Sequence, residues 1–189
     1  MKPWRKIDSE QLLQNRWLSV RADECELRNG KILKPFYVIE ENDWVHVFAV
    51  DLERHVLTVK QFRYAANIVC IELPGGVVEF NETPLAAAQH ELLEETGFTA
   101  DRWSKVAAVY ANPARQTNLI HIFVAEGLDE GGLQTLDESE DIEHSFASEK
   151  VVKSQIRDGE FSQSSHIATF YLCLEHLSAR ERDTVRPRE

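Results

Sequence analysis

A short apolar segment that ends in a proline and two glycines, followed by a helix with clear ends, is the most informative local pattern in the sequence. Residues Ile68–Leu73 are typical of a strand, and they run directly into the Pro-Gly-Gly turn. Thr83 and the proline after it are typical of a helix start, because the hydroxyl accepts from the first turn and proline lacks an N–H that would need a partner. An apolar stripe at helical spacing continues to Gly97, which predicts a helix over residues 84–96.

Segments on both sides of this pattern predict more strands than helices. Two apolar, β-branched segments separated by a short charged turn predict a hairpin, and Asn29-Gly30 predicts a tight turn between earlier strands. The expected strands lie within residues 17–39, 44–51, 56–62, 68–73, 104–110 and 119–125 and near residue 142, and the later helices cover residues 148–158 and 164–180. Because helices and strands do not alternate strictly, the pattern indicates an α+β fold.

The net charge argues against one class of binding protein. The chain carries 32 Asp and Glu against 21 Lys and Arg, which gives a formal net charge of −11. A protein that binds nucleic acid or anionic lipid through phosphate charges needs a positive field, so neither nucleic acid nor membrane is an expected partner. The polar N-terminus, the lack of a long apolar segment and three widely spaced cysteines predict a cytoplasmic protein.

Three glutamates on the predicted helix are the strongest candidates for chemistry. Glu91 and Glu95 lie one turn apart on the same helix face, and Glu94 is three residues from Glu91. Like charges this close destabilise an isolated helix, and no Lys or Arg lies within residues 76–98 to neutralise them. A hard divalent cation such as Mg²⁺ would remove the repulsion, because it binds carboxylate oxygens and keeps waters that substrate phosphates replace.

The acidic excess of the whole chain is concentrated in two segments. Residues 76–98 and 129–143 together contain twelve acidic residues and no Lys or Arg, whereas the rest of the chain is nearly neutral. The first segment holds the candidate metal ligands, and the second predicts an acidic loop. Metal ions bound there would partly cancel the local field, so an acidic protein of this kind can accept an anionic substrate.

The spacing around these glutamates resembles the signature of the Nudix hydrolases. That signature reads Gly, five residues, Glu, seven residues, then Arg-Glu-apolar-x-Glu-Glu-x-Gly-apolar. Here Gly76 and Glu82 are followed by residues 90–98, His-Glu-Leu-Leu-Glu-Glu-Thr-Gly-Phe, so eight of the nine specified positions agree. The departure is His90, which stands where the family usually has an Arg that orients the glutamates.

The resemblance implies an architecture and a metal site. It implies an α/β/α sandwich with a mixed sheet over residues 44–189, and residues 1–43 would form a small N-terminal β-strand extension that makes a homodimer. Glu94 is expected to act in catalysis as well as in metal binding. The expected ligands of Mg²⁺ or Mn²⁺ are Gly75 through its backbone carbonyl and the side chains of Glu91, Glu94 and Glu95.

Features outside this signature resemble one subgroup, the enzymes that act on ADP-ribose and other nucleoside diphosphate sugars. Residues 61–63, Gln-Phe-Arg, are similar to a motif whose Arg contacts the substrate, which makes Arg63 a candidate for substrate binding. Pro113 stands where the subgroup tends to carry a proline, and Arg115 is a second candidate for holding phosphate oxygens.

The same subgroup has an acidic loop that supplies the general base. Residues 138–142, Glu-Ser-Glu-Asp-Ile, resemble that loop, so Glu138 and Glu140 are both candidates for the base. The two cannot be separated by sequence pattern, and both stay open.

The leading hypothesis is a metal-dependent pyrophosphohydrolase that cleaves a nucleoside diphosphate sugar to nucleoside monophosphate and sugar phosphate. One alternative is a nucleoside triphosphate pyrophosphatase, which would have neither the N-terminal extension nor the second acidic loop. The other is a Nudix-fold sensor that binds a nucleotide sugar without cleaving it. Loss of the glutamates would favour the sensor, yet all three are present.

Overall fold

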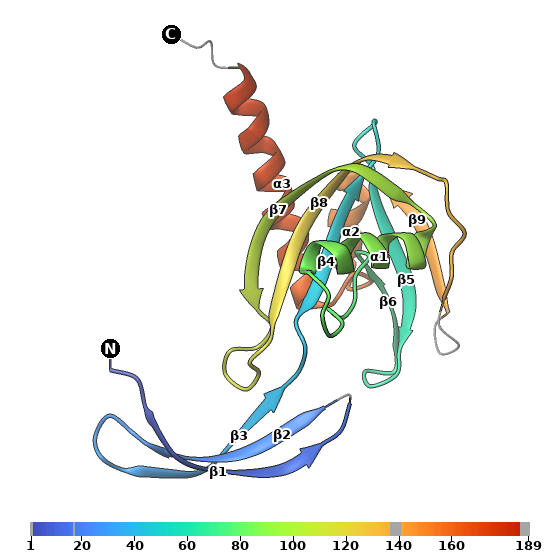
Figure 1. Ribbon diagram of the computed structural model, residues 1–189. Coiled ribbons are helices and arrows are strands. Elements are labelled where there is room, and N and C mark those ends of the chain that lie inside the picture. Colours follow the sequence, from blue (N-terminus) through green and yellow to red (C-terminus); the bar gives the residue numbers. More distant parts are fainter. Residues whose placement is uncertain (1, 17, 137–140, 186–189) are drawn as a thin grey trace. The chain divides into compact units, whose positions relative to one another are not determined.

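The structure, a computed structural model, describes residues 2–16, 18–136 and 141–185 (Figure 1). The chain divides into two compact units. The first unit comprises Met1–Asp43 and Val109–Leu119, and the second comprises Trp44–Ala108 and Ile120–Glu189. The segment Val109–Leu119 thus belongs with the N-terminal residues although it is far from them in sequence.

The first unit contains a three-stranded antiparallel sheet in the order β1-β2-β3. Its strands are β1 (Arg5–Gln14), β2 (Ser19–Glu26) and β3 (Ile32–Glu40). The predicted turn at Asn29-Gly30 is confirmed, since Gly30 has a φ of 78° and donates its N–H to Leu27. β1 was not predicted, because all of its residues are exposed and exposure removes the alternating apolar pattern that marks a half-buried strand.

The second unit is built on a six-stranded mixed sheet with the order β6-β5-β4-β8-β7, in which β9 also pairs with β5. The parallel pair is β4 with β8, whereas β5 is antiparallel to β4, β6 and β9. The strands are β4 (Trp44–Val50), β5 (Val56–Arg63), β6 (Ile68–Glu72), β7 (Thr99–Tyr110), β8 (Leu119–Asp129) and β9 (Ile142–Ala147). The predicted mixed sheet is therefore confirmed.

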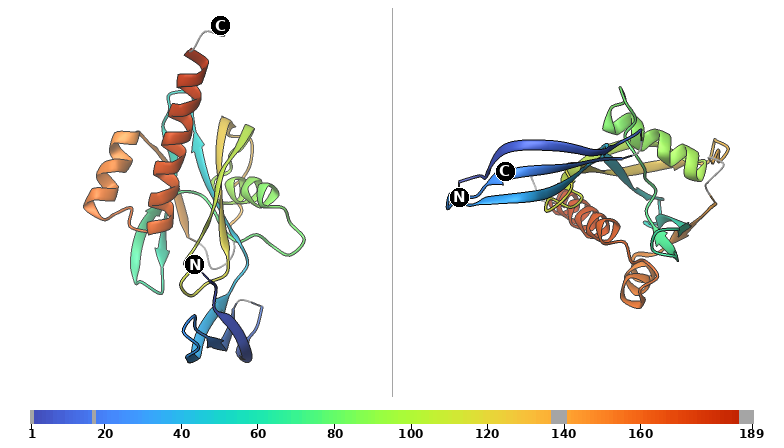
Figure 2. Two further views of the ribbon diagram at one scale, coloured as in Figure 1. Left: turned by 90° about the vertical axis from the view of Figure 1, so that its left-hand side faces the viewer. Right: turned by 90° about the horizontal axis from the view of Figure 1, so that it is seen from below.

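Helices cover both faces of this sheet, as Figure 2 shows. α1 (Pro84–Thr96) lies on one face, and α3 (Ser164–Val185) lies on the other with α2 (Glu149–Asp158) beside it. Alternate residues of β4 face opposite sides, so Val45 and Val47 belong to the core against α1, while Phe48 meets Phe170 of α3 with ring centroids 5.8 Å apart. The predicted α/β/α sandwich is confirmed.

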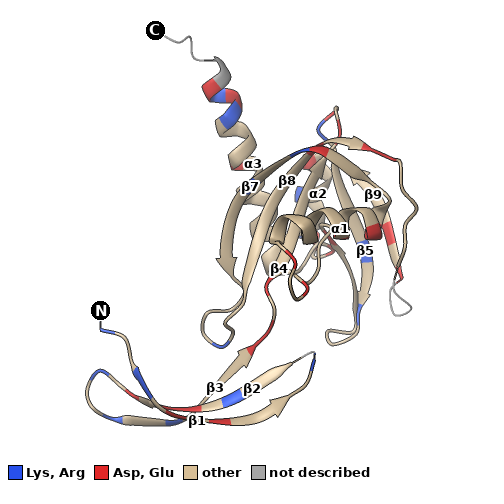
Figure 3. Ribbon diagram, viewed as in Figure 1, with Lys and Arg blue, Asp and Glu red and all other residues tan. Residues whose placement is uncertain are grey.

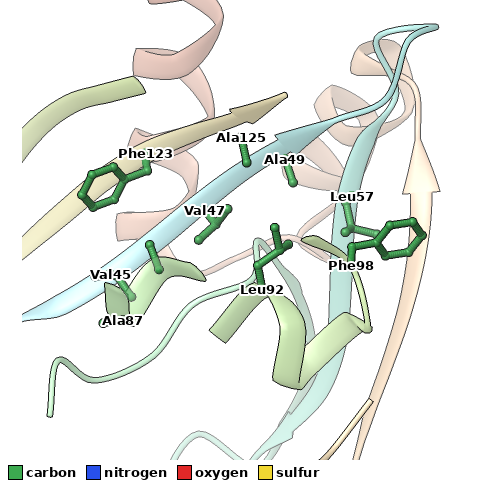
Figure 4. Packing of buried hydrophobic residues seen from close by; sticks show 10 residues of the cluster. Val45, Val47, Ala49, Leu57, Ala87, Leu92, Phe98, Phe123 and Ala125 are labelled. Carbon is green, nitrogen blue, oxygen red and sulfur yellow. The ribbon is translucent and has the colours of Figure 1, made fainter. Parts of the chain in front are cut away.

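The core between α1 and the sheet is made of small, branched and aromatic apolar side chains (Figure 4). Burial on both faces explains why β4 reads as an almost continuous apolar segment instead of an alternating one. The buried members of this cluster are Val45, Val47, Ala49, Leu57, Ala87, Ala88, Leu92, Phe98, Phe123 and Ala125.

The predicted ends of α1 are confirmed, and those of some other elements are not. The Thr83 hydroxyl accepts from Ala86 N, and Gly97 ends the helix with a φ of 73°. β7 begins earlier than expected and β8 ends later, because polar residues interrupt the apolar pattern in both extensions. α3 continues past Arg180, which donates to Glu126 over 2.7 Å. Among the described helices, none is both long enough and apolar enough to cross a membrane.

Candidate metal and substrate site

The Pro-Gly-Gly turn after β6 lies along β4 as an extra antiparallel segment. Val47 donates its N–H to the Pro74 carbonyl over 2.8 Å, and Val45 donates to the Gly76 carbonyl over 2.9 Å. A Cβ on Gly75 would lie 2.2 Å from the Val45 carbonyl oxygen, a distance that no side chain tolerates. Glycine is therefore required at Gly75, because the turn approaches the backbone of β4 too closely for any other residue.

Gly75 links this turn to the end of α1. Its N–H donates to Oε2 of Glu95 over 2.9 Å, and the Glu95 residue is only 3% exposed. The Gly75 N–H thus points toward the Glu95 carboxylate, whereas the carbonyls of Pro74 and Gly76 point toward β4.

Glu91 lies against the same turn. A Cβ on Gly76 would stand 2.1 Å from Oε1 of Glu91, so the carboxylate occupies the space that a larger residue would need. The two consecutive glycines thus serve different contacts, one with β4 and one with a candidate metal ligand. Glu95 thus contacts Gly75 and Glu91 contacts Gly76, so both glutamates lie against the Pro-Gly-Gly turn.

Glu94 points toward His90, one turn earlier on α1. Nε2 of His90 lies 3.0 Å from Oε2 of Glu94, and its Nδ1 lies 4.0 Å from Oε1 of Glu82. The histidine therefore stands between two acids of the signature, at the position where the family has an orienting Arg. His90 is well exposed, with 62% of its side chain accessible.

The chemistry of these donors fits a hard divalent cation. Three carboxylates and one backbone carbonyl offer only oxygen, which is the ligand type that Mg²⁺ and Mn²⁺ prefer. Figure 3 marks acidic residues on α1 and in the segment that leads to β9. The assignment of Gly75, Glu91, Glu94 and Glu95 as metal ligands stays a prediction.

A different trio of side chains has its ligand atoms closest together. Among the described residues, Asp51, Glu53 and His55 form the one group whose candidate ligand atoms all lie within 4.8 Å of one another. They lie in the turn between β4 and β5, where Asp51 accepts from the backbone N–H of His55 over 2.7 Å. This arrangement is explained by the turn itself, since an aspartate that bonds the backbone a few residues later stabilises such turns.

The loop after β8 is hydrogen-bonded to the last turn of α1. Gly132 donates its N–H to the Gly97 carbonyl, and Thr135 donates to the Glu94 carbonyl, each over 3.0 Å. Gln134 donates from Nε2 to the Glu95 carbonyl over 2.7 Å. The final carbonyls of a helix lack partners within it, so this loop satisfies them at the residues that carry two candidate ligands.

Gln134 also fixes the far end of the loop. The same Nε2 donates to the carbonyl of Ile142, the first residue of β9, over 2.9 Å. Both ends of the acidic segment are thus tied to the end of α1. No sequence signal marks Gln134, because its partner on α1 is 39 positions away. The predicted bases Glu138 and Glu140 lie outside the described residues and stay predictions.

Arg63 ends β5 and forms an ion pair with Glu72 of β6. Its Nε donates to Oε1 of Glu72 over 3.0 Å and its Nη2 to Oε2 over 2.5 Å. The bond to Glu72 raises the pKa of Arg63 above its ordinary value. Glu72 was not predicted from the sequence, although a lone acid in an apolar strand next to the Pro-Gly-Gly turn was a signal for it.

The other two predicted substrate residues belong to the first unit. Arg115 places its guanidinium carbon 5.9 Å from the ring centroid of Phe36, and its carbonyl accepts from Ile39 N over 2.8 Å. Pro113 lies in the same segment, between β7 and β8. Contacts of Pro113 and Arg115 with a substrate stay predictions.

Two protein-family models match different parts of the chain. A model of the NUDIX domain matches residues 42–169. A second model, described as the nucleoside diphosphate sugar hydrolase N-terminal domain, matches residues 4–39.

Two relatives and one solved structure extend the comparison. ADP-ribose pyrophosphatase of Bacillus subtilis (strain 168) is 35% identical over 124 residues, which span 66% of each chain. GDP-mannose pyrophosphatase of Salmonella arizonae is 28% identical over 185 residues, which span 89% of this chain and 94% of that protein. A crystal structure of an ADP compounds hydrolase superposes with a TM-score of 0.83 at 19% identity, covering 96% of this chain and 98% of the other.

Proposed function

The chain belongs to the Nudix hydrolase family, and from that premise we propose that it is a divalent-metal-dependent pyrophosphohydrolase acting on a nucleoside diphosphate sugar. The products are a nucleoside monophosphate and a sugar phosphate, with ADP-ribose as the first substrate to test. The observation that carries the proposal is the contact of Glu91 and Glu95 with the two glycines of the turn. The predicted family is confirmed, and the substrate names of the two relatives support the choice of substrate class.

The chain's own residues account for binding and proton transfer. A bound Mg²⁺ or Mn²⁺ neutralises diphosphate charge and favours attack of water on phosphorus. Glu91, Glu94, Glu95 and the Gly75 carbonyl hold the ion, and Arg63 holds a phosphate oxygen. Glu138 or Glu140 accepts the proton of the attacking water as the new P–O bond forms and the bridging P–O bond breaks.

The two alternative functions have less support. A sensor without catalysis has no need for the three carboxylates of the signature on α1, yet Glu91, Glu94 and Glu95 are all present. A nucleoside triphosphate pyrophosphatase has no need for an acidic loop fastened to α1, yet Gln134 and Thr135 fasten one. The match of residues 4–39 to an N-terminal domain of nucleoside diphosphate sugar hydrolases also favours a diphosphate sugar as the substrate.

Substrate and metal are tested together by one panel. The purified protein is incubated with Mg²⁺ and ADP-ribose, GDP-mannose, ADP-glucose, a dinucleoside polyphosphate or a nucleoside triphosphate, and the products are resolved by chromatography. We expect nucleoside monophosphate and sugar phosphate from a diphosphate sugar, and no turnover when EDTA removes the ion. Binding without cleavage across the panel would favour the sensor, and preferred release of pyrophosphate from a triphosphate would favour the other enzyme.

We further propose that the sheet of the first unit forms a homodimer. β1 has only exposed residues, including the large apolar side chains Ile7, Leu12 and Leu13. A small sheet is stable in water only when an apolar face is covered, and clustered exposed apolar residues mark interaction surfaces. A second copy of the chain would cover these side chains.

Sedimentation velocity tests the dimer. We expect the wild-type protein to sediment as a dimer and Ile7→Glu or Leu13→Glu to shift it toward monomer, because a charge in the interface must lose its hydration. Leu52→Glu is the matched control, since Leu52 is 88% exposed in the turn between β4 and β5. A wild-type protein that remains monomeric at every concentration would contradict the proposal.

A further inference from the structure

Glu72 is a fully buried carboxylate that the reaction outlined above does not use. The residue is 0% exposed and lies at the end of β6, just before the Pro-Gly-Gly turn. A charge removed from water is costly unless partners satisfy its oxygens. The partners of Glu72 therefore indicate the role of its negative charge.

One partner is Arg63, through the fork in which Nε reaches Oε1 and Nη2 reaches Oε2. Such a two-point contact fixes the plane of the guanidinium as well as its position. Two of the five N–H groups of the arginine are used in this way, which leaves others for a second acceptor. With 42% of its side chain exposed, Arg63 can meet an anion from solvent.

The other partners come from the start of α3. The side-chain amide of Gln163 lies against Glu72. Because a carboxylate only accepts hydrogen bonds, the amide nitrogen is assigned to the atom that faces it, 2.7 Å from Oε1 and 3.1 Å from Oε2. Nε2 of His166 lies 3.5 Å from Oε2 of Glu72. Nδ1 of His166 accepts from the Leu73 N–H over 3.2 Å, so its proton is on Nε2 and faces the carboxylate.

A second histidine, His46, packs against the ring of His166. The ring of His46 stacks on it with centroids 3.7 Å apart, and Nδ1 of His46 lies 2.9 Å from Oγ1 of Thr169. Burial lowers the pKa of His46 to about 3 and that of His166 well below its ordinary value, so both rings are neutral at pH 7. Arg63 is therefore the cation that balances Glu72.

We propose that Glu72, held by Gln163 and His166, is a positioning residue that orients Arg63 toward the diphosphate of the substrate. The inference rests on the proposed function, and it adds the start of α3 to the parts of the fold that shape the substrate site. A free arginine side chain samples many rotamers, whereas the fork fixes the cation before substrate binds. Pre-orientation of this kind strengthens binding because less conformational freedom is lost.

Steady-state kinetics with the best substrate of the panel test the proposal. Glu72→Gln should raise KM by about 10-fold, the lower end of the 10–100-fold range known for residues that orient metal ligands, and change kcat little. Arg63→Gln should raise KM at least as much. The double variant Glu72→Gln/Arg63→Gln should have the same KM as Arg63→Gln alone, because Glu72 acts through Arg63.

Two controls keep the result interpretable if a variant is unstable. Gln163→Met removes one partner of Glu72 and leaves both charges in place, and it should raise KM several-fold. Thr58→Val removes a different buried hydrogen bond of β5, that of the threonine hydroxyl to the Ser145 carbonyl over 3.0 Å. It should lower the melting temperature without changing KM.

A measurement without substrate separates this inference from the proposed function. The NMR signal of the Arg63 Nε–H, identified by its loss in Arg63→Gln, should exchange slowly with water in the wild type and rapidly in Glu72→Gln. The positioning role would be overturned if Glu72→Gln raised KM by the same factor in the wild type and in Arg63→Gln. It would also be overturned if Arg63→Gln left KM unchanged. In both cases the proposed activity would stand. An inactive wild type with a slowly exchanging Arg63 would instead overturn the proposed function, and the positioning role with it.

Discussion

Replacing Glu95 with Gln should lower kcat by more than about 100-fold, because loss of a metal ligand costs more than the 10–100-fold typical of an outer-shell partner. The substitution keeps the size of the side chain, and the amide oxygen can still accept from the Gly75 N–H, which is now 2.9 Å from Oε2. What it removes is one negative charge from the group of candidate ligands. The concentration of Mg²⁺ needed for half-maximal rate should rise as well.

The measurements are the steady-state rate, its Mg²⁺ dependence and the melting temperature of each protein. Glu79→Gln is the matched control, since Glu79 belongs to the same acidic segment but is exposed. It should retain wild-type activity, which shows that the effect is not a general loss of negative charge. A wild-type rate in Glu95→Gln would contradict the metal assignment.

The second large effect concerns the acidic loop. Of the variants Glu138→Gln and Glu140→Gln, the one that removes the general base should lower kcat by about 10²–10⁴-fold, the usual contribution of such a group. The wild-type rate should fall as pH decreases, because a protonated carboxyl cannot accept the proton of water. In the variant that lacks the base, this fall should disappear.

Glu130→Gln is the control within the same loop, and it should leave both the rate and the pH profile unchanged. Glu130 is exposed and precedes the residues that bond to α1. Single-turnover kinetics show whether the chemical step is the one that slows. If neither loop variant slows that step, the base lies elsewhere in the chain.

Features with local causes were predictable from the sequence. The helix α1 begins and ends where Thr83 and Gly97 predict, because a cap is formed by residues within one turn of each other. The hairpin turn at Gly30 follows from the same kind of short-range preference. The spacing of three and four residues was enough to place the glutamates near one another on a helix. The resemblance to the family was visible because its nine signature positions lie within residues 76–98.

The tertiary structure alone decided which distant groups meet. Gln134 reaches the end of α1, and Glu72 receives Arg63 from one strand and Gln163 from the segment before α3, through contacts that no short-range pattern encodes. β1 likewise exists through its pairing with β2 and has no apolar pattern of its own. The sequence by itself determined the local elements and the carboxylates of α1, because their partners are near neighbours in the chain. Folding of the sheet and helices decided the contacts between residues distant in sequence, because hydrogen bonds and ion pairs depend on distance in space.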